Sequence, residues 1–232
     1  MNSSLLLPRP QGSSLDEGSL TIVGRTRRVY DTLASVYPAS TFFFHSKAHT
    51  CALRHSRIRN GMRVLEVATG SGEMFRRLIQ ANPDGKTFGL DLSPKMAAHT
   101  MHRARREFPR AQAHCGAVDV RDLPFRDASF DVVMCCYLLE LLAEQDIART
   151  LREIGRVLRS GGTFSLVVIG QNVRLFNRLY EVCGALAPAF WGRQVEHDVP
   201  GLIRAAGLRI VTDQFVRQGF YPSRVLAARK SR

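Results

Sequence analysis

The chain has 232 residues and a formal net charge of +13, and arginine supplies 29 of its 33 cationic side chains. No stretch approaches the ~18 consecutive apolar residues of a membrane-spanning helix. The five cysteines are odd in number and form no C-x-x-C pair or paired cysteine and histidine spacing. This usage argues against a disulfide framework and against zinc, so we expect no metal site and a cytoplasmic location.

The N-terminal segment differs in composition from the rest of the chain. Residues 1–20 are rich in serine, glycine and proline, and the Leu5–Leu7 cluster is too short for the apolar core of a secretory signal. We therefore expect a flexible tail over 1–20. The remaining residues, 21–232, have a length at which α/β folds often form one unit, and we expect a single domain there.

Residues 63–91 combine a short apolar run, a glycine turn, a helix-length stretch and a strand that ends in an acid. The apolar run is Val64–Ala68, the turn is Thr69–Gly72, and the second strand is Thr87–Asp91. This order is typical of a strand, turn, helix and strand unit that binds a nucleoside at the carboxyl ends of its strands. The alternative is a turn between a strand and a helix that binds no ligand.

The residue types of this unit suit a nucleoside chemically. Gly70 and Gly72 place no side chain between the backbone and a ligand. A helix that begins near Glu73 points its first N–H groups and the positive end of its dipole at the ligand. Asp91 lies where a carboxylate accepts both ribose hydroxyls. Phe75 occupies the position of the third glycine in G-x-G-x-x-G, which disfavours a dinucleotide.

Several segments resemble, in order, the motifs of the class I S-adenosylmethionine-dependent methyltransferases, in particular the group of the ubiquinone and menaquinone biosynthesis methyltransferases. They are Glu66–Gly72, Gly89–Met96, Asp119–Phe125, Asp127–Val133 and Leu158–Gly162. The last of these resembles the turn before the fifth strand, with Ser160 where a proline is usual. The resemblance covers about 28–168 well and the rest weakly.

The alternation of strands and helices predicts an α/β fold, with a parallel sheet between helices and a ligand at its carboxyl edge. The resemblance adds that the fold is Rossmann-like, with a seven-stranded, mostly parallel sheet whose last strand is antiparallel. Apolar residues at helical spacing over 147–158 predict a helix that packs on the sheet and turns its arginine and glutamate residues to water. We expect a further helix over 199–206 and strands over 208–216 and 221–228.

The resemblance implies S-adenosylmethionine as the cofactor. Glu66 and the backbone of the glycine turn would hold its methionine part, Asp91 its ribose, and the carbonyl of Cys135 would lie near its amine. The implied cofactor-binding residues are Glu66, Ala68, Gly70, Ser71, Gly72, Asp91, Leu92, Met96, Asp119, Val120 and Cys135.

The same resemblance assigns four of these residues to the adenine. Leu92 and Met96 would flank the ring, Asp119 would accept its amino group, and the N–H of Val120 would reach a ring nitrogen. An acceptor at this edge suits the amino group of adenine.

The catalytic residues stay open, because a sulfonium methyl is already activated and the protein mainly aligns the reactants and excludes water. The sequence shows no His/Asp dyad. The candidates are Glu140, which follows the fourth strand, and Tyr37, which lies in a segment similar to the family's Y-D-x-x-A-x-x-Y-D lead-in. A structural role is the alternative for both. We expect His45, His49 and His55 to be solvated or to cap a helix.

Two segments flank the predicted core. N-terminal cap helices are expected over about 28–60, and an apolar insertion over about 171–196 is expected to close over the acceptor and exclude water. An ordinary amphipathic helix buried on the core is the alternative for the insertion.

The basic surface attracts anions such as nucleic acid or anionic lipid headgroups. No nucleic-acid-binding module appears, and the fourth strand is not followed by an N-P-P-Y-type segment, so nucleic acid is the less favoured partner. We predict methyl transfer to a small, hydrophobic or lipid-like acceptor, of quinone type or a phospholipid headgroup, with peripheral contact to an anionic membrane. The alternatives are an RNA methyltransferase and a cofactor-binding regulator without turnover, and the oligomeric state stays open.

Overall fold

The computed structural model describes residues 37–170, 178, 195–219 and 221–231, with side chains from Ser46 onward. The predicted tail, the first part of the cap segment and most of the predicted insertion lie outside the described residues. Tyr37 is the first residue of a described helix, but its side chain lies outside them as well.

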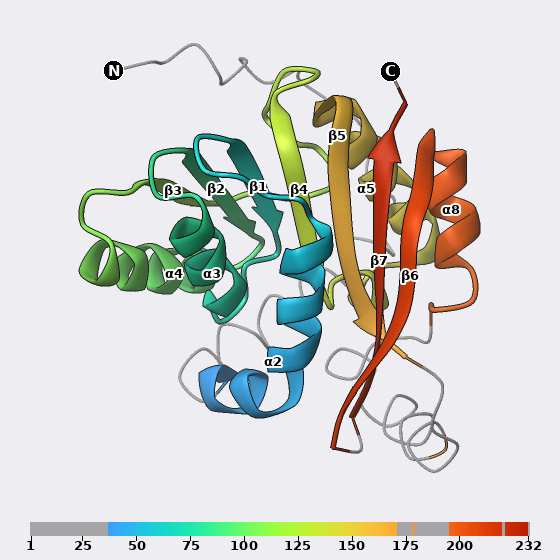
Figure 1. Cartoon of the computed structure of the whole chain (residues 1–232), viewed down its shortest axis with the longest axis horizontal. Helices are drawn as coiled ribbons and strands as arrows, with labels where there is room; N and C mark the ends of the chain where they lie inside the picture. The colour runs from blue at the N-terminus through green and yellow to red at the C-terminus, as the bar shows by residue number, and fades with distance from the viewer. Residues whose placement is uncertain (1–36, 171–177, 179–194, 220, 232) are drawn as a thin grey trace.

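One seven-stranded sheet organises the described residues (Figure 1). Its strands are β1 Arg63–Val67, β2 Lys86–Asp91, β3 Gln112–Ala117, β4 Phe130–Cys136, β5 Leu158–Ile169, β6 Leu208–Gln218 and β7 Tyr221–Lys230. Their order in the sheet is β3-β2-β1-β4-β5-β7-β6. The first five are parallel, and β7 runs antiparallel to both β5 and β6. The predicted fold class is confirmed.

Helices cover both faces of the sheet. They are α2 Tyr37–His55, α3 Glu73–Ala81, α4 Pro94–Glu107, α5 Glu144–Val157 and α8 Val199–Ala205, with a short 3-10 helix at Leu139–Leu141. In Figure 1 the first three lie in front of the sheet, whereas α5 and α8 lie behind it. The predicted helix at 199–206 and the two C-terminal strands are present with slightly different bounds.

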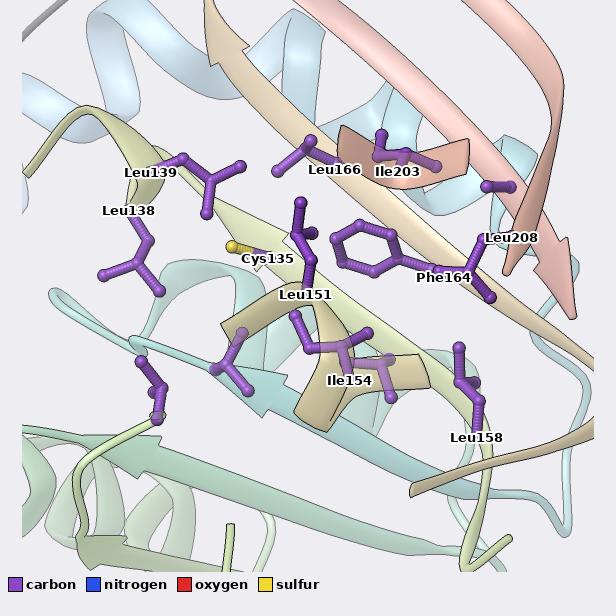
Figure 2. Packing of buried hydrophobic residues seen from close by; sticks show 14 of the residues in the cluster. Cys135, Leu138, Leu139, Leu151, Ile154, Leu158, Phe164, Leu166, Ile203 and Leu208 are labelled. Carbon is purple, nitrogen blue, oxygen red and sulfur yellow. The ribbon is translucent and has the colours of Figure 1, made fainter. Parts of the chain in front are cut away.

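Apolar side chains from both faces of the central strands are buried, as expected of parallel strands between helices. Figure 2 shows the α5 side, where Leu151 and Ile154 of α5 lie beside Phe164 and Leu166 of β5, and Ile203 of α8 packs against the same cluster. All five are at most 1% exposed. Burying a side chain of this size stabilises the fold by about 1.5–3 kcal/mol.

Arg149, Arg152, Glu153 and Arg156 of α5 were predicted to face water, and this was wrong for three of them. Of these four, only Arg152 is exposed. Arg149 donates to the carbonyl of Arg121 at 2.9 Å, and Glu153 accepts the N–H of Leu123 at 2.9 Å. Arg156 donates to the carbonyls of Leu123 and Phe125. These side chains therefore hold the segment that follows β3, because its backbone offers polar groups that no strand satisfies.

The predicted turn at 158–162 is part of β5, which begins at Leu158. Its pairing with β4 is irregular there, and Gly161 has a φ of +73°. Among the described helices, none is both long and apolar enough to cross a membrane.

Candidate active site

Three predicted cofactor residues lie at the ends of neighbouring parallel strands. Val67 of β1 pairs with Leu90 of β2 on one side and with Cys135 of β4 on the other. Because these strands run in the same direction, Glu66, Asp91 and Cys135 reach the same carboxyl edge of the sheet. This edge of an open α/β sheet is where ligands bind.

The turn between β1 and α3 adopts left-handed backbone conformations. The φ angles are +61° at Ala68, +49° at Gly70 and +75° at Gly72. Alanine is strained in this region by about 1–2 kcal/mol. Such strain is typical of functional sites, and the E-x-x-x-G-x-G pattern, which leaves position 68 open, did not predict it.

Gly72 is required by a close approach as well as by its φ. A Cβ at this position would lie 2.9 Å from Oγ1 of Thr100, which belongs to α4. The turn is closed by the N–H of Gly72, which donates to the carbonyl of Thr69 at 2.9 Å. The glycine therefore lets α4 pack directly on the turn.

The carboxylate of Asp91 is oriented by two backbone donors. Oδ2 accepts the N–H of Gly70 at 2.8 Å, and Oδ1 accepts the N–H of Ser93 at 2.9 Å. The residue is 8% exposed. The acid at the tip of β2 is thus tied to the glycine turn by a hydrogen bond.

Glu66 is a buried carboxyl with an unsatisfied oxygen. It is 1% exposed, and its Oε2 has no hydrogen-bond partner within the described part of the chain. Burial, followed by the nearby charges of Asp91 and Glu73, raises its pKa well above the ordinary value. A buried acceptor without a donor is costly. A ligand amine or another cationic group at this edge would satisfy it.

Glu73 opens α3 directly after the turn and is held by three arginines. Arg76 and Arg77 contact its Oε1 at 3.0 Å each, and Arg103 of α4 contacts its Oε2 at 3.2 Å. Burial alone would raise its pKa, but hydrogen bonds from Arg76 and Arg77 lower the pKa to about 2. Glu73 therefore carries its charge while that of Glu66 is suppressed.

Asp119 lies in the segment after β3 and is paired with Arg121. Nε of Arg121 lies 3.0 Å from Oδ1 of Asp119, and Nη2 lies 2.6 Å from Oδ2. The third nitrogen, Nη1, contacts Asp146 of α5 at 3.0 Å. Burial raises the pKa of Asp119, but the hydrogen bonds from Arg121 outweigh it and lower the pKa. Arg121 had not been predicted, because its partner Asp146 is distant in the chain.

The remaining predicted cofactor residues differ in what they present at this edge. Met96 is 1% exposed and Val120 is 7% exposed, so both side chains pack within the protein. Ser71 is buried as well, whereas Leu92 is half-buried. Of the two residues expected to flank the adenine, Leu92 is the one with side-chain surface at the carboxyl edge.

Glu140 lies where the fourth and fifth strands end. It belongs to the 3-10 helix after β4, and its Oε1 accepts the N–H of Ile169, the last residue of β5, at 2.6 Å. The residue is 3% exposed, and no described group forms a hydrogen bond with its Oε2. Burial raises its pKa to about 7. A carboxyl with this pKa suits proton transfer near neutral pH.

A further polar group beside this edge had not been predicted. Tyr137, directly after β4, has a φ of +54°, and its hydroxyl lies 2.8 Å from Oγ of Ser223 in β7. The ring of His49 from α2 lies 6.1 Å from the Tyr137 ring, between centroids. His49 is 3% exposed and lies inside α2, so the expectation that it is solvated or caps a helix was wrong at this position. His55 is half-buried near Gln214, and the side chain of His45 precedes the described side chains, which start at Ser46.

Known methyltransferases are similar to this chain in sequence and in fold. A model for a methyltransferase domain matches residues 64–162. A 2-phytyl-1,4-naphtoquinone methyltransferase from Trichormus variabilis is 26% identical over 163 residues, which are 66% of this chain and 70% of that protein. A demethylmenaquinone methyltransferase from Symbiobacterium thermophilum is 32% identical over 143 residues, which are 60% of this chain and 56% of that protein.

A solved structure supports the fold. The N-methyltransferase NodS from Bradyrhizobium japonicum, in complex with S-adenosyl-L-homocysteine, aligns with a TM-score of 0.70. The alignment covers 90% of this chain and 100% of that one at 14% identity. With the motif residues gathered at one sheet edge, the chain is an S-adenosylmethionine-dependent methyltransferase similar to those of class I, and S-adenosylmethionine is its cofactor.

Proposed function

We propose that this enzyme methylates a quinone-type acceptor, a hydroxylated aromatic ring with an apolar tail. The observation that carries the proposal is the similarity to the two relatives named for 2-phytyl-1,4-naphtoquinone and demethylmenaquinone. A phospholipid headgroup is less favoured because neither of these relatives is named for one. This acceptor class also agrees with the predicted apolar insertion over 171–196.

The carboxyl edge fits the cofactor at two points. Bound S-adenosylmethionine supplies a methyl group on a cationic sulfonium. Oε2 of Glu66, which is buried without a donor, suits the cofactor's amine, and the glycine turn lets the ligand approach the backbone of Ala68 and Ser71. We assign the ribose hydroxyls to Asp91, and the carbonyl of Cys135 to the same amine as Glu66.

The adenine is assigned to the segments after β2 and β3. The half-buried Leu92 would cover one face of the ring, with Met96 packed behind it. Asp119 would accept the amino group, and the N–H of Val120 would reach a ring nitrogen. Arg121 supports this assignment because it fixes the Asp119 carboxylate in one orientation.

Glu140 is proposed as the proton acceptor. Its Oε2 would take the proton from a ring hydroxyl, and the electron pair of that O–H bond would enrich the neighbouring ring carbon. This carbon would bond to the methyl group while the methyl–sulfur bond breaks and its electron pair stays on sulfur, which leaves S-adenosylhomocysteine. Loss of the proton from the methylated carbon and return of a proton to the ring oxygen would restore the aromatic ring. Three observations support this role: its place at the ends of β4 and β5, its burial, and its lack of a described partner at Oε2. Tyr37 stays a prediction.

The test incubates the purified protein with labelled S-adenosylmethionine and one acceptor in each reaction. The acceptors are a reduced prenylated naphthoquinone, phosphatidylethanolamine and transfer RNA. We expect labelled product with the quinol alone. Glu140→Gln should lower kcat by about 10²–10⁴-fold, the contribution of general base catalysis. Product with phosphatidylethanolamine or RNA alone would contradict the proposal. S-adenosylhomocysteine binding without transfer to any acceptor would favour a regulatory role.

A further inference from the structure

The outer side of α4 carries a row of basic side chains. Lys95, His99, His102 and Arg106 are all exposed. At 100° per residue they fall within an arc of roughly 60°, and the row is about 16 Å long. Arg105, in the same last turn, is also exposed. In Figure 1, α4 lies at the β3 end of the sheet, away from β6 and β7.

The row has one sign of charge. The segment 92–117 contains five lysine and arginine residues and a single acid, Glu107. Glu107 pairs with Arg103, which also contacts Glu73 and lies outside the row. No ion pair involves Lys95, Arg105 or Arg106 within the part of the chain that the structure describes. The positive charge of this surface is therefore not neutralised by the protein.

The cations of the row are not needed to form the helix. Ser93 caps α4 by accepting the N–H of Met96 at 3.2 Å, and Pro94 occupies its first position. The opposite side buries apolar residues such as Ala97 and Ala104. Lys95 lies in the first turn, where a cation opposes the helix dipole, and no acid compensates it there. Lys95 thus has a cost for the helix, and no ion pair within the described residues accounts for it.

We propose that this row, Lys95, His99, His102 and Arg106, is a docking surface for an anionic lipid bilayer. Negatively charged headgroups complement it, and each lysine or arginine near such a surface raises the affinity about fivefold. The first turn of α4 follows Asp91 and Ser93 directly, so a bilayer held here lies beside the carboxyl edge of the sheet. The choice of a lipid rests on the proposed function, because a prenylated acceptor resides in a membrane.

A single-stranded nucleic acid fits this surface less well. Proteins that bind single strands combine cations with aromatic side chains on which the bases stack. The exposed large hydrophobic residues among those described are Val211 and Phe215, and both belong to β6 at the far end of the sheet. The row also offers no large apolar side chain for insertion, so the contact with lipid is electrostatic and reversible.

The test is sedimentation with vesicles of phosphatidylcholine, with or without phosphatidylglycerol. We expect binding only to the anionic vesicles, weakening as salt is raised. Lys95→Glu with Arg106→Glu changes one residue at each end of the helix, so the two effects on the dipole oppose each other. This double variant should bind at least tenfold more weakly.

The matched control is Arg126→Glu with Arg152→Glu, which makes the same change in net charge at two exposed positions outside α4. It should bind within about threefold of the parent. Equal losses in the two variants, or no binding to anionic vesicles, would overturn the proposal. A different result would assign the row to nucleic acid instead: the parent still binds transfer RNA at salt concentrations that release the vesicles, and the α4 variant does not. The assay needs neither cofactor nor acceptor, so its result is independent of whether a quinol is methylated.

Discussion

The guanidinium of Arg121 donates to both carboxylate oxygens of Asp119, and its remaining nitrogen contacts Asp146 in the first turn of α5. The side chain of Arg121 is 3% exposed, whereas that of Asp119 is 35% exposed. A buried cation thus holds a partly exposed acid in place. If Asp119 accepts the adenine amino group, the orientation of its carboxylate for that contact depends on Arg121, which does not itself contact the ligand in this assignment.

Replacing Arg121 by methionine should therefore affect both stability and cofactor binding. The change leaves two carboxylates near each other without their shared cation, which should lower the free energy of unfolding by about 3 kcal/mol. Under conditions where the variant stays folded, KM for the cofactor should rise with little change in kcat. Arg152→Met, at an exposed position of α5, should stay within about 0.5 kcal/mol in urea unfolding. A variant of Arg121 as stable as this control would refute the positioning role.

Gly72 and Gly161 form a natural pair for testing the close approach of α4. Their φ angles are +75° and +73°, but a Cβ at Gly72 would meet Thr100 Oγ1 at 2.9 Å, whereas one at Gly161 would meet nothing within 4 Å. Alanine is strained by a similar amount at both positions. Gly72→Ala should cost about 1–3 kcal/mol more than Gly161→Ala, the usual penalty of overpacking.

Urea unfolding of the two alanine variants measures this difference. Adding Thr100→Ala to Gly72→Ala should recover part of the loss, because it removes the nearest atom. Equal costs for the two glycines would mean that the turn moves away from α4 at little expense.

The strands and the glycine turn could be predicted because their signals are local. Apolar runs mark buried parallel strands, and Gly70 and Gly72 mark a turn without side chains. What could not be predicted depends on contacts between distant residues. Arg121 meets Asp146 across 25 positions, and Glu140 meets the N–H of Ile169 across 29. Helical periodicity likewise identified the apolar side of α5 but not that its arginines hold a neighbouring segment.

Replacing Asp91 should act mainly by weakening the binding of the cofactor. Asp91→Ala removes the carboxylate proposed to accept the ribose hydroxyls, and hydrogen bonds to a charged group contribute about 1.5–3 kcal/mol. The Kd for S-adenosylhomocysteine in calorimetry should rise by about 10–150-fold. Asp122→Ala, at an exposed acid near the same edge, should change it less than twofold. An unchanged Kd for Asp91→Ala would remove the ribose assignment.

Glu140 should make the stability of the fold depend on pH in a defined window. Its pKa is raised from 4.5 to about 7 because the carboxyl is buried. The folded chain therefore holds this proton to higher pH than the unfolded chain does. The resulting stabilisation is complete below pH 4.5 and is lost as the pH rises to about 7. The loss is at most about 3.5 kcal/mol, since each pKa unit corresponds to about 1.4 kcal/mol.

Glu140→Gln keeps an oxygen that accepts the N–H of Ile169 but does not ionise, so the variant isolates this effect. Relative to the parent, its free energy of unfolding should increase between pH 4.5 and 7 and then stay level. Glu73 affects stability with the opposite pH dependence and in a lower pH range. Its pKa is lowered to about 2, so its contribution to the free energy of unfolding is lost only as the pH falls below 4.5. Because Glu73 is present in both proteins, it cancels in their difference. Parallel curves for the two proteins would show that Glu140 ionises as it does in water, and a buried proton acceptor at the ends of β4 and β5 would then be untenable.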